Sequence, residues 1–203
     1  MTFTTSTARP QARGILVVCT GNVCRSPMVE RLLQAALDQR YGAGLVPVSS
    51  AGTGALVGSA MDERSAELLA QLGGDDEGFT ARAITEPIVA GAQLVLTATR
   101  DHRASVVRLH PRAMRRSFTV RELGLALAAV PEQELPTADD PLERLTEVAE
   151  LGNRLRGAHL PATPEDLDLT DPFRQPDEVY RELRGQVEAA LPGLLRGLVG
   201  PAR

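Results

Sequence analysis

The sequence predicts a single α/β domain, doubly wound around a four-stranded parallel sheet with helices on both faces. A continuous apolar run at residues 14–19 is typical of a strand buried on both faces of a parallel sheet. Strand-like and helix-like segments then alternate as far as residue 120, which favours right-handed parallel crossovers. The length of 203 residues fits one domain with an elaboration better than two domains.

Hydrophobic periodicity and start and stop signals give each element in order. The strands are expected at residues 14–19, 45–50, 93–98 and 117–120, and the helices at residues 26–40, 61–72, 101–109, 142–155 and 176–191. Ser26 suits the N-cap of the first helix and Pro27 its first position. Pro47 favours an edge position for the second strand, because proline cannot donate to a neighbouring strand. Gly73 and Pro192 are expected to end the second and the last helix.

The chain divides into a leader, a main domain and an inserted segment. Residues 1–13 are polar and rich in Thr and Ser, which is typical of a disordered leader. The domain is expected over residues 14–198. Within it, the proline-rich residues 123–168 surround one amphipathic helix and form a helical insertion before the last helix. We expect this insertion either to lie beside the functional cleft as a lid or to extend the outer layer of the sheet.

Composition excludes several classes of function. With 26 acidic and 22 basic side chains the formal net charge is −4, which argues against nucleic-acid binding. The apolar runs are much shorter than the ~18–20 residues that span a bilayer, so no membrane association is expected. Two cysteines cannot form a disulfide scaffold or a four-thiolate zinc site, and no secretion signal is evident. We expect a cytoplasmic, metal-free protein that is a monomer or a weak homodimer.

The most informative segment is residues 19–27, Cys-Thr-Gly-Asn-Val-Cys-Arg-Ser-Pro. It joins a buried strand to a capped helix, at the carboxyl edge of the sheet where ligands of α/β proteins bind. Gly21 and Asn22 tolerate the left-handed backbone angles that turn successive N–H groups inward to form an anion-binding nest. The positive end of the following helix and the guanidinium of Arg25 add to this anion site.

Cys19 lies at the base of the predicted nest. Helix N-termini and cationic neighbours lower a thiol's pKa from ~8.5 to roughly 3.5–7.5, so a thiolate is expected here. A thiolate beneath a bound phosphate is a nucleophile placed for in-line attack, and the same N–H groups stabilise the equatorial oxygens.

The loop resembles the signature loop of the low-molecular-weight protein tyrosine phosphatases. Ser50-Ala-Gly-Thr53, Asp62 with Arg64, and Asp171-Pro172-Phe173 also fit that family, and the likeness covers residues 14–122 and 169–191. The insertion has no counterpart in typical members. The resemblance implies a phosphatase without cofactor or metal that hydrolyses phosphotyrosine-type phosphomonoesters, on a phosphorylated protein or a small molecule, through a phosphocysteine intermediate.

The resemblance also implies a role for each site residue. Cys19 would be the nucleophile, Arg25 would bind phosphate and its transition state, and Ser26 would donate a hydrogen bond to the Cys19 sulfur. Asn22 would hold the loop's shape with support from Ser50. The phosphate-binding residues would be Thr20, Gly21, Asn22, Val23, Cys24, Arg25 and Ser26. Cys24 resembles the family's second cysteine, which is either able to trap an oxidised Cys19 as a disulfide or only packed in the core.

Three aspartates compete for the general acid, which protonates the leaving group and is worth about 10²–10⁴-fold. Asp171 lies in the loop before the last helix, where the family carries its acid, and is the residue we assign. Asp140 precedes the inserted helix, where an N-cap accounts for it, and Asp168 is a third contender.

Several alternatives stay open. Bacterial protein-arginine phosphatases of the same family carry threonine at the position of Val23, so Val23 favours an aryl phosphate. The segment Ala55-Leu56-Val57 replaces the family's aromatic cleft wall, which weakens stacking on phosphotyrosine. An arsenate reductase, a phosphocysteine carrier and an inactive phosphoprotein-binding relative are the other readings. Residues 100–121 contain seven arginines and one acid, a basic stretch that either attracts acidic segments or is balanced by the acidic insertion, and His102 is expected on the surface.

Overall fold

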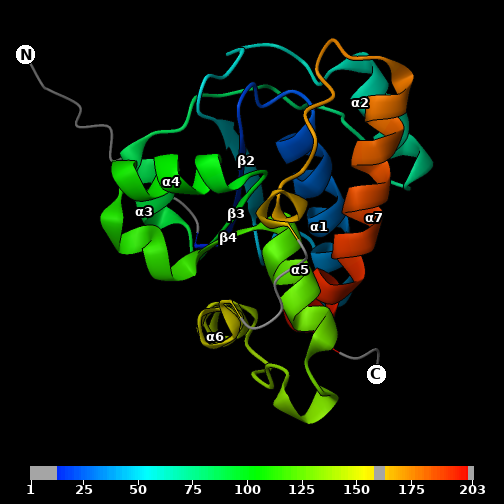
Figure 1. The fold of residues 1–203 in the computed structure, drawn as a ribbon. Helices are drawn as coiled ribbons and strands as arrows, with labels where there is room; N and C mark the ends of the chain where they lie inside the picture. Colours follow the sequence, from blue (N-terminus) through cyan, green and yellow to red (C-terminus); the bar gives the residue numbers. More distant parts are fainter. Residues whose placement is uncertain (1–12, 158–162, 201–203) are drawn as a thin grey trace, which may run out of the picture.

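A four-stranded parallel sheet in the order β2-β1-β3-β4 forms the centre of the computed structural model, which describes residues 13–157 and 163–200 (Figure 1). Its strands are β1 (Ile15–Cys19), β2 (Val48–Gly52), β3 (Leu94–Thr97) and β4 (Ser117–Thr119). The predicted fold class is confirmed, and β2 is the edge strand that Pro47 indicated. The predicted leader, apart from its last residue, lies outside the described residues.

Helices cover both faces of the sheet. They are α1 (Arg25–Tyr41), α2 (Glu63–Gln71), α3 (Glu86–Gly91), α4 (Arg100–Leu109), α5 (Val120–Ala129), α6 (Pro141–Leu155) and α7 (Asp177–Val199), with 3-10 helices η1 (Pro111–Arg116), η2 (Glu132–Glu134) and η3 (Pro164–Leu167). Alternate residues of β1 face opposite ways: Ile15 and Val17 belong to the core with α1, α5 and α7, and Leu16 and Val18 to the core with α3 and α4. In the described segments no helix has the length and apolar character to cross a bilayer.

Several element boundaries differ from those expected. Cys24, not Ser26, occupies the N-cap of α1, so Ser26 lies inside the first turn with its side chain buried. The second strand begins at Val48, since Pro47 ahead of it contributes only its carbonyl, which accepts from the Ile15 N–H at 3.0 Å. The fourth strand ends at Thr119, because Thr119 and Glu122 form a capping box that starts α5. Neither α3 nor α5 was expected from the periodicity.

The prediction that Pro192 breaks the last helix is wrong, because α7 continues through it to Val199. An internal proline costs a helix about 3 kcal/mol, and close packing of the following turns offsets this cost. A Cβ atom on Gly193 would lie 1.9 Å from the Gly124 carbonyl oxygen, so only glycine allows α7 to approach α5 this closely. Leu194 and Leu198 beyond the proline are buried.

The described part of the segment predicted to be an insertion packs on the main core of the fold. α6 contributes Leu145, Val148 and Leu151 to the same core as α5 and α7. The Gln93 amide, just before β3, donates to the Leu142 carbonyl at 2.9 Å and to the Thr146 hydroxyl at 2.8 Å. α6 therefore lies at the amino ends of the strands, the end of the sheet remote from the loop that follows β1 (Figure 1).

Candidate active site

The loop between β1 and α1 forms one wall of a small pocket of about 150 Å³ at the carboxyl edge of the sheet. The pocket is lined by Cys19, Thr20, Gly21, Val23, Cys24, Arg25, Gly54, Leu56, Asp171 and Phe173. The structure thus brings together the three residues predicted to be catalytic, Cys19, Arg25 and Asp171, although Asp171 is 146 positions from Arg25 in the chain. No described residue between positions 123 and 168 lines this pocket.

The carbonyl groups of the loop point outward and are held by the next segment of chain. The N–H groups of Thr53, Gly54 and Leu56 donate at 2.9–3.0 Å to the carbonyls of residues 19, 20 and 21, and the Asp62 N–H donates to the Val23 carbonyl at 2.8 Å. Within the described residues, the N–H groups of residues 20–24 donate to no backbone carbonyl. Five adjacent donors are therefore available to an anion, as the nest predicted from Gly21 and Asn22 requires.

Asn22 fixes the shape of the loop from within. It is completely buried and has a left-handed backbone with φ of 56°. Its Nδ2 donates to the hydroxyls of Ser26 at 2.9 Å and Ser50 at 2.7 Å, and its Oδ1 accepts from the Arg82 N–H at 2.9 Å. One side chain thus ties together the loop, β2 and the segment before α3.

A buried carboxyl group continues this network. The Ser50 hydroxyl donates to Glu30 of α1, and the Arg82 Nε donates to the Ser50 carbonyl at 2.8 Å. Burial raises the pKa of Glu30, against the opposing effect of its Ser50 hydrogen bond. The sequence indicated Ser50 as support for the loop but gave no signal for Glu30 behind it.

Cys19 ends β1 beneath the loop. Its side chain is buried, and its Sγ lies 2.9 Å from the Ser26 Oγ. Because the Ser26 hydroxyl also accepts from Asn22, its own hydrogen is free to point at the sulfur. The Ser26 hydroxyl is therefore well placed to donate to the sulfur.

Arg25 reaches across the pocket to the loop before α7. It is 4% exposed; its Nη2 donates to Asp171 Oδ2 at 2.6 Å and its Nη1 to the Leu169 carbonyl at 3.3 Å. Its Nε is buried and has no hydrogen-bond partner among the residues described. A buried guanidinium with an unused donor is a ready partner for a phosphate oxygen.

The other two aspartates serve elsewhere. Asp140 caps α6, where it accepts from the N–H groups of Leu142 and Glu143. Asp168 pairs with Arg100 at 3.1 Å and accepts from its backbone N–H at 2.8 Å. Only Asp171, whose side chain is 51% exposed, lines the pocket.

His102 was expected on the surface, and this prediction is wrong. The side chain is 8% exposed and lies between two threonines, with Nδ1 2.7 Å from Thr99 Oγ1 and Nε2 2.9 Å from Thr20 Oγ1. The Thr20 hydroxyl also accepts from Arg25 Nη2 at 3.3 Å. Burial and the neighbouring Arg25 lower the pKa of His102 to about 4, so the ring is neutral at pH 7.

A signal for His102 existed in the sequence. Thr99 follows β3, the strand beside β1, and caps α4 by accepting from the His102 N–H at 3.2 Å. Residues in the first turn after a neighbouring strand face the same edge of the sheet as the loop. The position of His102 in the first turn after β3, and not the arginines beside it in the sequence, was therefore the signal that would have predicted its place at the site.

Cys24 sits in a small apolar cluster with Val23 and Ala81, against Phe79 and Phe173. Burial raises the pKa of Cys24 to about 12, despite a hydrogen bond with Ser65. It is therefore a neutral thiol in this structure. Neither described cysteine forms a disulfide.

In the described segments, no group of three or more His, Cys, Asp or Glu side chains could hold a metal ion. The positive charge at the site comes from Arg25 and the backbone N–H groups.

Comparisons with known proteins identify the family of the chain. A family profile described as low molecular weight phosphotyrosine protein phosphatase matches residues 14–144. The low molecular weight protein-tyrosine phosphatase A of Mycobacterium bovis is 32% identical over 181 residues, which cover 89% of this chain and 88% of that protein. The match to AmsI of Erwinia amylovora is 37% identical over 97 residues, and spans 48% of this chain and 63% of that relative.

Solved structures show the same fold. The crystal structure of the Erwinia amylovora tyrosine phosphatase AmsI superposes with a TM-score of 0.63 at 22% identity, over 92% of this chain and 93% of that one. The YwlE arginine phosphatase from Geobacillus stearothermophilus gives a TM-score of 0.63 at 26% identity, over 92% of both chains. From the profile, the Mycobacterium relative and the fold together, the chain belongs to the low-molecular-weight protein tyrosine phosphatase family, a family of phosphatase enzymes.

Proposed function

We propose that this protein hydrolyses phosphotyrosine-type phosphomonoesters through a phosphocysteine intermediate. The observation that carries the proposal is the convergence of Cys19, Arg25 and Asp171 on one pocket whose loop presents unused backbone N–H groups. That arrangement provides a nucleophile, an anion site and a proton donor within a single small cavity. The relatives' names as tyrosine phosphatases point the same way.

In the first step, the Cys19 thiolate attacks phosphorus and the bond from phosphorus to the ester oxygen breaks. Asp171 gives its proton to the departing oxygen, which leaves as a neutral phenol or alcohol. The N–H groups of residues 20–24 and the Arg25 guanidinium stabilise the equatorial oxygens of the transition state. To reach phosphate with all its donors, Arg25 exchanges its contact with Asp171 for the ligand, which frees the carboxyl group to act on the leaving group.

In the second step, water attacks the phosphorus of phosphocysteine and Asp171 accepts a proton from that water. The sulfur–phosphorus bond breaks and inorganic phosphate leaves. The Ser26 hydroxyl, 2.9 Å from Sγ, stabilises the returning thiolate. Asn22 and Ser50 keep the loop in its open, left-handed form through both steps.

The walls of the pocket favour a planar leaving group. Leu56 and Phe173 are among its lining residues and supply apolar contact area for an aryl ring. Val23 presents no hydroxyl to orient a phosphoguanidinium. The competing substrate is phosphoarginine, because the chain is also similar to an enzyme named an arginine phosphatase.

We further propose that Cys24 serves as a packed thiol. Its burial and raised pKa hold it as the neutral form, which attacks an oxidised Cys19 slowly. The alternative, a protective disulfide with Cys19, requires local opening of the apolar cluster around Cys24.

Turnover of p-nitrophenyl phosphate and of matched phosphotyrosine and phosphoarginine peptides tests the function. The wild type should release phosphate from the first two, and Cys19→Ser should abolish release. Faster turnover of the phosphoarginine peptide than of the phosphotyrosine peptide would show that the protein is an arginine phosphatase. Binding without turnover would indicate a phosphocysteine carrier or an inactive binding relative, and reduction of arsenate would indicate a reductase.

A further inference from the structure

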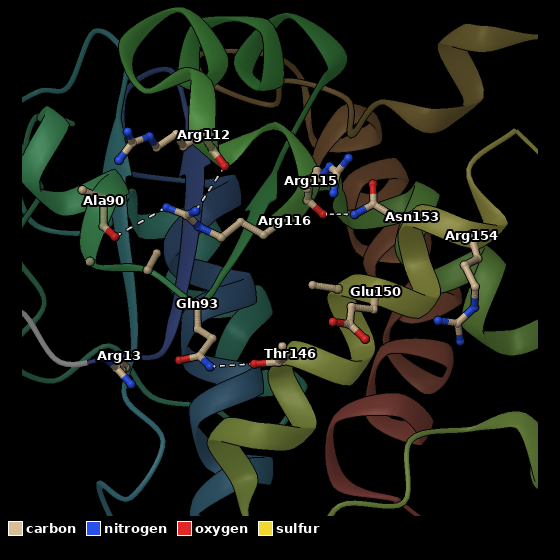
Figure 2. A pocket seen from close by; sticks show the side chains of 13 residues that line it. Arg13, Ala90, Gln93, Arg112, Arg115, Arg116, Thr146, Glu150, Asn153 and Arg154 are labelled. Atoms are coloured by element: carbon tan, nitrogen blue, oxygen red, sulfur yellow. Dashed lines mark hydrogen bonds between the residues drawn. The ribbon is translucent and has the colours of Figure 1, made fainter.

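A second cavity lies far from the catalytic pocket, at the amino ends of the strands. It is an open groove of about 820 Å³ (Figure 2). Its lining includes Arg13 just before β1, Gln93 just before β3, and Arg116 just before β4. The catalytic loop follows the opposite, carboxyl end of β1, so the two cavities are at opposite ends of the sheet.

Five arginines line this groove and only one acid does. Arg112, Arg115 and Arg116 come from η1, Arg154 and Glu150 come from α6, and Arg13 enters from the chain before β1 (Figure 2). None of the five guanidiniums forms an ion pair with a carboxylate in the described ranges, and neither does Glu150. We call this lining the arginine groove.

Some arginines of the basic stretch at residues 100–121 are paired with carboxylates, and others line the arginine groove. Arg100 pairs with Glu165 and Asp168, and Arg103 pairs with Glu122, so the region around the insertion balances these two charges. Arg112, Arg115 and Arg116 have no ion-pair partner among the described residues. Helix α6 adds a further positive charge, Arg154, to the groove and does not neutralise these three arginines.

Hydrogen bonds hold the two walls of the groove in place. The Asn153 amide of α6 donates to the Arg115 carbonyl, and Gln93 donates to Thr146 of α6 at 2.8 Å (Figure 2). The α6 residues Thr146, Glu150 and Asn153 therefore contribute one wall of the groove.

Arg116 shows the strongest need for an anion. Among the described residues, its side chain donates hydrogen bonds to three carbonyl oxygens, those of Arg112 at 3.2 Å, Val89 at 3.2 Å and Ala90 at 3.4 Å. Its Nε is buried with no hydrogen-bond partner among the residues described, and burial lowers its pKa. A carboxylate bound in the groove would compensate a charge that the chain itself leaves partly desolvated.

We propose that the arginine groove binds an acidic segment of a partner protein. The groove is several times larger than the catalytic pocket, and its charges are spread over three elements, so they do not converge on one point. Spread guanidiniums on an open surface suit a series of carboxylates along an extended chain better than a single phosphate. This site is independent of the phosphatase chemistry and would stand even if Cys19 had no catalytic role.

Binding of a labelled peptide tests the site directly. The probe is a fluorescein-labelled twelve-residue peptide of alternating Glu and Ser, with a Gln and Ser peptide as the uncharged control, followed by anisotropy at constant salt. The test variant is Arg112→Gln with Arg154→Gln. The matched control is Arg181→Gln with Arg184→Gln, which removes the same charge from α7, outside the groove.

The groove variant should bind the acidic peptide at least fivefold more weakly, about 1 kcal/mol, while the α7 control stays within twofold of wild type. A thermal unfolding midpoint equal to that of the wild type shows that each variant is folded. Equal loss in both variants would show diffuse attraction and overturn the site, as would unchanged binding in the groove variant.

Two further arms separate other occupants. Saturating acidic peptide should leave turnover of p-nitrophenyl phosphate within twofold, whereas competitive inhibition would place the peptide in the catalytic pocket and contradict the proposal. A labelled single-stranded oligonucleotide of equal charge should bind more weakly than the peptide. Tighter, arginine-dependent binding of the oligonucleotide would overturn a protein segment as the occupant.

Discussion

Replacing Asn22 by alanine should both destabilise the fold and disable the phosphate loop. Asn22 is completely buried and makes three hydrogen bonds, to Ser26, Ser50 and the Arg82 N–H. A buried hydrogen bond contributes about 1 kcal/mol, and the unpaired Arg82 N–H adds a desolvation cost of similar size. The left-handed φ of 56° costs alanine about 1 kcal/mol more than asparagine. We expect Asn22→Ala to lower the free energy of unfolding by about 5 kcal/mol.

Asn22→Gly separates the two causes. Glycine adopts the left-handed region without strain, so its loss should be about 1 kcal/mol smaller than that of alanine and reflect the hydrogen bonds alone. Urea unfolding, analysed at constant m-value, measures the free energy of unfolding of both variants. The value of kcat/KM for p-nitrophenyl phosphate shows whether the phosphate loop still functions. Both variants should lose activity, since glycine relieves the strain but leaves the loop unsupported. A loss of stability below 1 kcal/mol for both, or wild-type activity in either, would refute the role given to Asn22.

Three further predictions concern single groups of the site. Asp171→Asn should slow hydrolysis by about 10²–10⁴-fold for phenyl phosphate and far less for dinitrophenyl phosphate, whose leaving group needs no proton; equal losses would point to another acid. Because the pKa of His102 is lowered to about 4 while the unfolded residue titrates near 6.5, the unfolded state binds the proton first as pH falls. Stability should therefore decrease by as much as about 3 kcal/mol between pH 6.5 and 4, and His102→Gln should flatten this decrease; a pH-independent difference between the two proteins would contradict it. With its pKa raised to about 12, Cys24 should escape iodoacetamide at pH 7.5, so that native protein incorporates one label and urea-unfolded protein two.

The parts of the fold that depend on nearby residues in the sequence could be predicted from the sequence. The buried run at β1, the edge position of β2 and the amphipathic α6 follow from hydrophobic pattern and from Pro47. The continuation of α7 through Pro192 could not be predicted, because it depends on the close contact of Gly193 with Gly124, 69 positions away. The start of α1 at Arg25 was missed because Ser26, a good N-cap residue, faces the Cys19 sulfur instead.

The residues of the candidate site likewise divide into those that could be predicted from the sequence and those that could not. Residues of one contiguous loop, Cys19 to Ser26, could be identified from their order alone. Groups brought in by the fold could be predicted only where a motif or a position just after a strand marked them, as the Asp-Pro-Phe context marks Asp171 and the first turn after β3 marks His102. Glu30 carries no such signal, and its place next to Ser50 follows from the packing of α1 against the sheet.

Trapping the covalent intermediate tests the central proposal most directly. The Asp171→Asn variant is mixed with dinitrophenyl phosphate, which forms the intermediate without an acid, quenched within one turnover, digested and analysed by mass spectrometry. Since the second step lacks its base, we predict that phosphate accumulates on the peptide containing Cys19, and that Cys19→Ala shows none. Full turnover with no phosphate on that peptide, or phosphate carried by a different residue, would contradict the mechanism.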